Sequence, residues 1–160
     1  MPLCATDALL SQMPPAAISF FATFSRFEFA LKRSDYARME ASGVVSADWD
    51  GFAKLLGKAF FGKVENSGRA SALINRPPKK QVLRSGKLDW DPVSKPTNAQ
   101  ELFGAIRRVR NNLFHGAKFS TGVEGDAVRD QQLLEEASWV LHAALAEADQ
   151  VREQFEQPLP

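Results

Sequence analysis

A chain of 160 residues fits one domain, and a hydrophobic content of 44% is enough to build a buried core. Its single cysteine, Cys4, excludes an internal disulfide framework and a zinc site made of several cysteines. The net charge of +1 is unevenly spread, because residues 63–118 hold 12 Lys and Arg against 4 Asp and Glu, whereas the rest of the chain is acidic. This basic block is either a solvated surface or a phosphate-binding one.

The N-terminal residues lack the features of a secretory signal, since no basic segment precedes an apolar run and Pro14-Pro15 interrupts the sequence early. No stretch comes near the roughly 18 apolar residues that a membrane span requires. We therefore expect a soluble protein of the reducing cytoplasm with no membrane partner, in which residues 1–15 form a flexible N-terminal segment.

Two helices are predicted in the first half of the chain, over residues 16–40 and 47–63. The first has one apolar face and is expected to stop near Gly43; that face holds Phe20, Phe24, Phe27 and Leu31, and Phe21 widens it. The second is capped by Ser46 or Asp48, and its buried side is supplied by Trp49, Phe52, Leu56, Ala59 and Phe60. Gly51 and Gly57 weaken this helix by about 1 kcal/mol each relative to alanine.

Residues 64–96 show no sustained periodicity and are rich in turn signals, among them Asn66-Ser67-Gly68, Pro77-Pro78, Ser85-Gly86, Pro92 and Pro96. We predict a long irregular connection here, a basic loop region with one short helix near residues 69–75. Such long loops are often functional, and Trp90 is expected to pin this one to the core.

A third helix is predicted over residues 98–112, because Thr97 and Gln100 fit a capping box and an apolar stripe follows, made of Leu102, Ile106, Val109 and Leu113. A last helix is predicted over residues 127–155, with an inner stripe of Leu134, Ala137, Leu141, Ala144, Leu145, Ala148 and Val151. No segment reads as a strand. The predicted fold is all-α, an up-down bundle of four main helices in one domain spanning residues 1–160.

The most informative motif is Arg110-Asn111-Asn112-Leu113-Phe114-His115, at the end of the third predicted helix. On an unbroken helix Arg110 and His115 lie about 140° apart in projection and do not meet. Either the helix breaks between them, which Asn111-Asn112 and Gly116 favour, or each works with a partner from another subunit. Arg108 also has a permitted spacing to His115, but a polar residue follows Arg110 and not Arg108, so Arg110 is the better candidate.

This motif resembles the R-x(4–6)-H motif of HEPN domains in its R-N-x-x-x-H form. The segments Phe24-Ser25-Arg26-Phe27-Glu28-Phe29-Ala30-Leu31-Lys32 and Asp48-Trp49-Asp50-Gly51-Phe52 are similar to the first helix and the second-helix start of HEPN proteins. The resemblance implies a small helical bundle that forms a homodimer, with two Arg–His motifs lining one cleft. Many members are metal-independent endoribonucleases of toxin–antitoxin or antiviral systems.

RNA cleavage needs neither a metal nor an enzyme nucleophile, because the 2′-hydroxyl of RNA can attack its own phosphate. His115 can move the protons, Arg110 can stabilise the phosphate charge, and Asn111 or Asn112 can orient the imidazole or donate to the phosphate. We expect RNA to bind along Lys79, Lys80, Arg84, Lys87, Arg107 and Lys118, with Glu28 pairing with an arginine near the motif. Each of these residues could equally have a purely structural role, as a solvated charge or as a side chain that caps a helix end.

Two other functions stay open on the sequence. Some HEPN proteins have lost catalysis and bind RNA or proteins, and others accompany a partner nucleotidyltransferase or an antitoxin. The sequence has no phosphate-binding glycine loop, no dinucleotide fingerprint and no zinc-hydrolase motif, so we predict no cofactor and no metal.

Overall fold

The computed structural model describes residues 5–115 and 127–159. Helices dominate this part of the chain, in the order α1 (Ala5–Gln12), α2 (Pro15–Arg33), α3 (Trp49–Ser67), α4 (Ser71–Asn75), α5 (Ala99–His115), α6 (Ala127–Ala146) and α7 (Asp149–Glu156). Two short hairpins interrupt them: β1 (Ala37–Met39) with β2 (Val45–Ala47), and β3 (Lys80–Arg84) with β4 (Lys87–Asp91).

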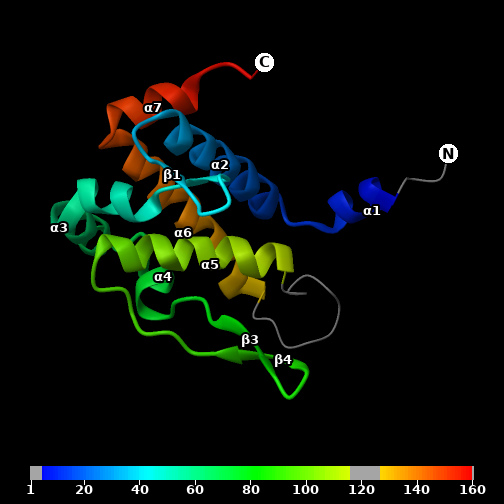
Figure 1. The fold of residues 1–160 in the computed structure, drawn as a ribbon. Helices are drawn as coiled ribbons and strands as arrows, with labels where there is room; N and C mark the ends of the chain where they lie inside the picture. The colour runs from blue at the N-terminus through cyan, green and yellow to red at the C-terminus, as the bar shows by residue number, and fades with distance from the viewer. Residues whose placement is uncertain (1–4, 116–126, 160) are drawn as a thin grey trace.

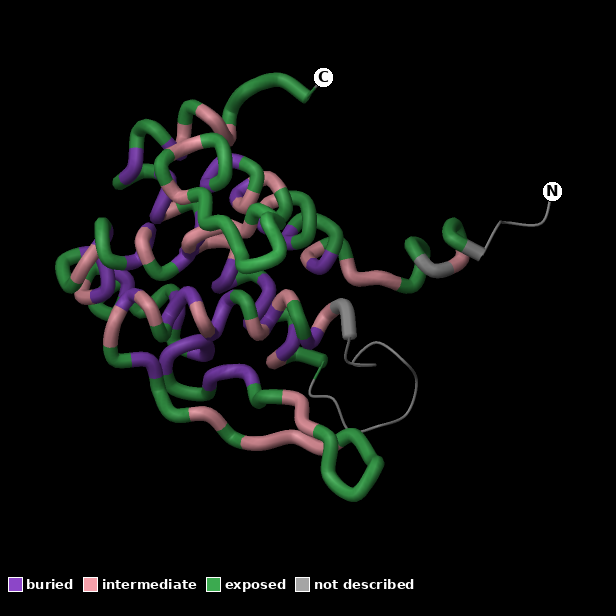
Figure 2. Tube along the Cα trace, in the orientation of Figure 1, coloured by how far each residue is buried: buried purple, intermediate pink, exposed green. Residues whose placement is uncertain are grey.

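The helices α2, α3, α5 and α6 surround one core, and their inward faces are buried while both hairpin loops are exposed (Figure 2). Helix α2 packs on α6 and α7, and α3 packs on α5. The predicted apolar face of α2 is confirmed, because Phe20, Phe24, Phe27 and Leu31 are each at most 3% exposed. Phe21 was wrongly included in it, since that side chain is 45% exposed.

Aromatic rings from three helices meet at the centre of the core. The indole of Trp49 is stacked on Phe27 with ring centroids 5.3 Å apart, and Phe103 of α5 lies 5.7 Å from the same indole. Phe52 contacts both Phe27 and Phe103. Aromatic pairs of this kind add about 0.5–1.5 kcal/mol beyond the burial of their area, so they hold α5 firmly against α2 and α3.

The prediction of a pure four-helix bundle with an irregular stretch over residues 64–96 was wrong. That stretch holds the end of α3, helix α4 and the antiparallel hairpin β3–β4, which lies at the edge of the molecule below α5 (Figure 1). Its turn is Ser85-Gly86, where both residues have positive φ, as a two-residue primed turn requires. A hairpin signal was therefore present in the sequence and was interpreted as an irregular loop.

The first and last predicted helices also end differently from the prediction. Helix α2 stops at Arg33, where the Ser34 hydroxyl donates to the carbonyl of Ala30 at 2.8 Å, and the chain then turns into β1–β2. The last predicted helix divides into α6 and α7 after Ala146. Arg26 of α2 fixes α7 in place, because its guanidinium donates to the carbonyls of Phe155, at 2.9 Å, and Gln157.

Helix α5 begins with a cap one residue later than predicted. The side chain of Asn98 accepts a hydrogen bond from the N–H of Glu101 at 2.9 Å, and Glu101 reaches back to the N–H and hydroxyl of Thr97. These bonds, the backbone bond first, hold the pKa of the Glu101 carboxyl below its usual value. The helix then continues through Asn111 and Asn112 to His115, so the predicted break between Arg110 and His115 was wrong.

Candidate functional site

Arg110 lies on the side of α5 that faces α2. Its guanidinium carbon is 5.8 Å from the ring centroid of Phe24, within reach of a cation–π interaction. One guanidinium nitrogen donates to the side-chain oxygen of Asn111 at 3.1 Å. The structure therefore brings Arg110 and Asn111 together, with the arginine partly buried and Asn111 exposed.

Asn112 joins the motif helix to the basic hairpin. Its side chain is only 5% exposed, and its amide nitrogen donates to the backbone carbonyl of Lys79 at 3.0 Å, directly before β3 begins. Because this bond engages the side-chain amide of Asn112 with a neighbouring segment, the amide does not compete with the backbone hydrogen bonds of α5. This explains how the helix continues through Asn112.

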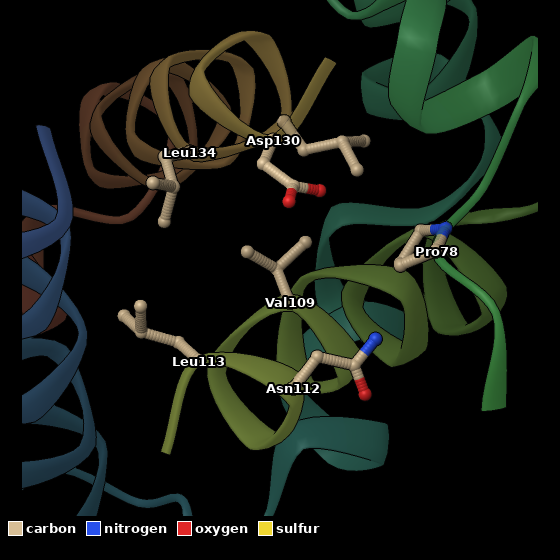
Figure 3. A pocket seen from close by; sticks show the side chains of 7 residues that line it. Pro78, Val109, Asn112, Leu113, Asp130 and Leu134 are labelled. Atoms are coloured by element: carbon tan, nitrogen blue, oxygen red, sulfur yellow. The ribbon is translucent and has the colours of Figure 1, made fainter. Parts of the chain in front are cut away.

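A small cavity lies beside Asn112, between α5, α6 and Pro78 (Figure 3). Its volume is about 20 Å³, enough for one water molecule. The side chain of Asp130, which is 9% exposed, extends from α6 toward Val109 on the cavity wall. Sequence reasoning did not select Asp130, and no motif in the sequence marks it.

His115 is the last residue of α5, and its side chain lies outside what the structure describes. Its position on the helix is nonetheless defined by the backbone. Because α5 is continuous, His115 and Arg110 are about 140° apart around the helix axis. Of the two alternatives left by the sequence, a broken helix is thus removed, and Arg110 and His115 start from different faces of one continuous helix.

The basic residues of the hairpin and of the segment before it differ in whether their charge is free to bind a ligand or is already paired within the protein. Lys79, Lys80 and Lys87 are exposed. Arg84 instead pairs with two carboxylates of the same hairpin, Asp91 at 2.6 Å and Asp89 at 2.7 Å. These two partners, Asp91 first, raise the pKa of the Arg84 guanidinium, and the pair already satisfies its charge. Among the described residues predicted to bind RNA, Arg84 is therefore the one whose charge already has partners within the protein.

The other predicted residues are scattered. Arg107 is exposed on α5, whereas Lys118 lies outside the described residues. Glu28 accepts a hydrogen bond from the indole N–H of Trp49 at 3.1 Å. Within the described part of the chain Glu28 has no arginine at ion-pair distance, so it supports the aromatic core and not the motif.

Arg108 is a residue that sequence reasoning set aside. It is partly buried and donates to the carbonyl of Gly104 at 3.2 Å, one turn earlier in α5. Burial lowers the pKa of its guanidinium. The sequence signal for Arg108 is its spacing to His115, which corresponds to two full helical turns and becomes informative only when the helix is known to be continuous.

Residues 5–115 and 127–159 contain no helix that combines the length and apolar character of a membrane span. In the same residues, no group of three or more His, Cys, Asp and Glu side chains is arranged to hold a metal ion. Comparison with known proteins found no matching family model, no similar curated protein and no similar solved structure.

Proposed function

We propose that this protein is a metal-independent endoribonuclease of the HEPN type, acting on cytoplasmic RNA as a toxin or defence effector. The observation that carries the proposal is the Arg110–His115 motif at the end of α5, tied through Asn112 to the basic segment that begins β3. Exposed lysines at positions 79, 80 and 87 supply positive charge for the RNA backbone next to this helix.

The reaction is an internal transfer at one phosphate of the RNA. A histidine takes the proton of the 2′-hydroxyl, the 2′-oxygen bonds to phosphorus, and the bond from phosphorus to the 5′-oxygen breaks. A second histidine gives a proton to that leaving oxygen. The products are a 2′,3′-cyclic phosphate and a 5′-hydroxyl, and an arginine stabilises the charge that develops on the phosphate oxygens.

A homodimer explains both requirements of this reaction. It supplies two copies of His115, one as base and one as acid, although each chain has a single histidine in the motif. It also allows Arg110 of one chain to act on the same phosphate as His115 of the other, which the roughly 140° between them prevents within one helix.

The test is incubation of the purified protein with mixed RNA in EDTA. We expect fragments that end in cyclic phosphate, and a loss of at least about 100-fold in rate for His115→Ala and for Arg110→Ala. His142→Ala is the matched control, because this second histidine is exposed on α6 and packs edge-on to Phe155. Undiminished cleavage by both motif variants contradicts the proposal.

The same preparation separates the competing functions. Retention of RNA without cleavage by the wild-type protein indicates a binding module. A stable complex with the product of a neighbouring gene indicates an antitoxin or a partner nucleotidyltransferase. Growth arrest on expression that disappears with His115→Ala supports the toxin role.

A further inference from the structure

Helix α5 presents Arg108 and His115 on one face. The two residues are seven positions apart, so they lie about 20° from each other around the axis of the continuous helix. Asn111 lies between them along the helix axis, about 40° from His115 and 60° from Arg108 in projection, and is exposed. By the same projection Arg107 is about 80° from His115 and Arg110 about 140°. Among the arginines of α5, Arg108 is thus the one that starts from the same face of the helix as His115.

The described surroundings of Arg108 supply no counter-charge to its guanidinium. No carboxylate in residues 5–115 and 127–159 lies at ion-pair distance from it, and its described hydrogen bond goes to a backbone carbonyl, that of Gly104. Its guanidinium is also partly withdrawn from water, and this burial lowers its pKa. Burial of a charge without a counter-charge is costly, and an anion bound at Arg108 offsets that cost.

Two other arginines of this fold have partners for their guanidinium groups. Arg84 has two aspartates within 2.7 Å. Arg129 donates to the carbonyls of Arg76 and Pro77 at 2.8 and 3.1 Å, where it fixes the chain that leads to the hairpin. Among the described residues, Arg108 has neither a carboxylate partner nor such a tether between segments.

We propose that Arg108 binds the phosphate under attack, from the same chain and the same face of α5 as His115, with Asn111 as a neighbouring amide donor. The proposal rests on the ribonuclease function above and adds a catalytic residue to it. The planar guanidinium matches two phosphate oxygens, and its i, i+7 position fixes that phosphate near the residue that moves the protons. Arg110 then contributes from the other chain of the dimer, so that two guanidinium groups hold the phosphate.

The experiment measures kcat and KM for cleavage of one RNA oligonucleotide in EDTA by wild type, Arg108→Gln, Arg108→Lys and Arg107→Gln. We expect Arg108→Gln to lower kcat by about 100-fold or more, as for loss of a donor to a charged transition state. Arg108→Lys keeps the charge and the packed aliphatic stem but not the fork of donors, and gives an intermediate kcat. Arg107→Gln removes an equal charge from the adjacent, exposed position and changes KM more than kcat.

Thermal unfolding of each variant shows whether it is folded. If Arg108→Gln is not folded, the kcat of Arg108→Lys decides whether Arg108 takes part in catalysis. A kcat for Arg108→Gln no lower than that for Arg107→Gln overturns the proposal. If the wild-type protein cleaves no RNA, the ribonuclease function fails, and binding of the 2′-O-methyl form of the oligonucleotide decides the role of Arg108. A weaker Kd and a salt slope lower by about one for Arg108→Gln support the phosphate contact, and an unchanged Kd overturns it.

Discussion

Glu136 is a charged residue in the interior whose role is visible only at the scale of single hydrogen bonds. Its carboxylate, on α6, accepts from the backbone N–H groups of Ala72, at 3.2 Å, and Leu73, at 2.9 Å. These are among the first N–H groups of α4, which have no partner inside their own helix. Gln132 donates a third hydrogen bond at 2.9 Å. The carboxylate is only 8% exposed, so the donors depend on it and not on water.

Replacement of Glu136 by alanine therefore leaves buried N–H groups unsatisfied, and we expect it to lower the free energy of unfolding by about 3 kcal/mol. Glu135→Ala is the matched control on the adjacent, exposed position, whose carboxylate accepts from Gln131 at the surface. A change within about 0.5 kcal/mol is expected there. Denaturant unfolding of both variants measures the difference, and equal losses contradict this account of Glu136.

At the scale of elements, α3 contains a kink that is not evident from its sequence. Gly57 has φ 63° and ψ −162°, a conformation that only glycine adopts readily. The expectation that Gly57 simply weakens a regular helix was therefore incomplete, because the chain uses this glycine to change direction. Leu56 and Phe60 on either side of it remain buried, so the kink keeps both parts of α3 on the core.

Two glycines of α3 consequently respond in opposite directions to alanine. A Cβ at Gly57 or at Gly62 meets no atom within 4 Å, so neither substitution is limited by space. We expect Gly57→Ala to lower the free energy of unfolding by about 1–3 kcal/mol through backbone strain. Gly62→Ala, in regular helix, raises it by about 1 kcal/mol. Denaturant unfolding measures both, and a stabilising Gly57→Ala contradicts the kink.

The long helices were predictable because each has its own local sequence signal. The prediction of a flexible segment over residues 1–15 was wrong, because α1 (Ala5–Gln12) forms there. The apolar period of α2 and of α6 identified buried faces without knowledge of any partner, and Asp48 was correctly named as a cap of α3, where it accepts from the N–H of Gly51. The hairpins were missed because a strand is stabilised by its neighbour. Strands β1 and β2 have three residues each, which is too short for an alternating pattern.

The sequence nominates the residues of the candidate site, but it does not predict how they are arranged in space. The low helix propensity of Asn111 and Asn112 favoured a break, yet a contact distant in sequence, from Asn112 to Lys79, occupies the amide that competes with the helix. Likewise, no local pattern assigns Arg84 to Asp89 and Asp91 until the register of the hairpin is known. Both corrections come from tertiary contacts, which override local propensity.

At the scale of the whole molecule, the proposed site needs two chains, and this requirement has a kinetic consequence. We expect a threefold excess of His115→Ala protein to lower the activity per wild-type chain about fourfold once subunits exchange, because mixed dimers hold one histidine in place of two. The measurement is the initial rate of RNA cleavage against the ratio of variant to wild type. A rate per wild-type chain that does not change with this ratio indicates that a single chain is sufficient.

The primed turn at the end of the β3–β4 hairpin provides a position at which a fluorescent dye can be attached. Ser85 is exposed and already adopts φ 50°, so a residue of similar size is accommodated there without a new backbone. Since Cys4 is the only cysteine of the chain, a protein with Cys4→Ser and Ser85→Cys accepts one thiol-reactive dye at that apex. A change in the emission of such a dye on addition of RNA tests whether a polynucleotide binds at the hairpin, while every side chain of α5 stays native.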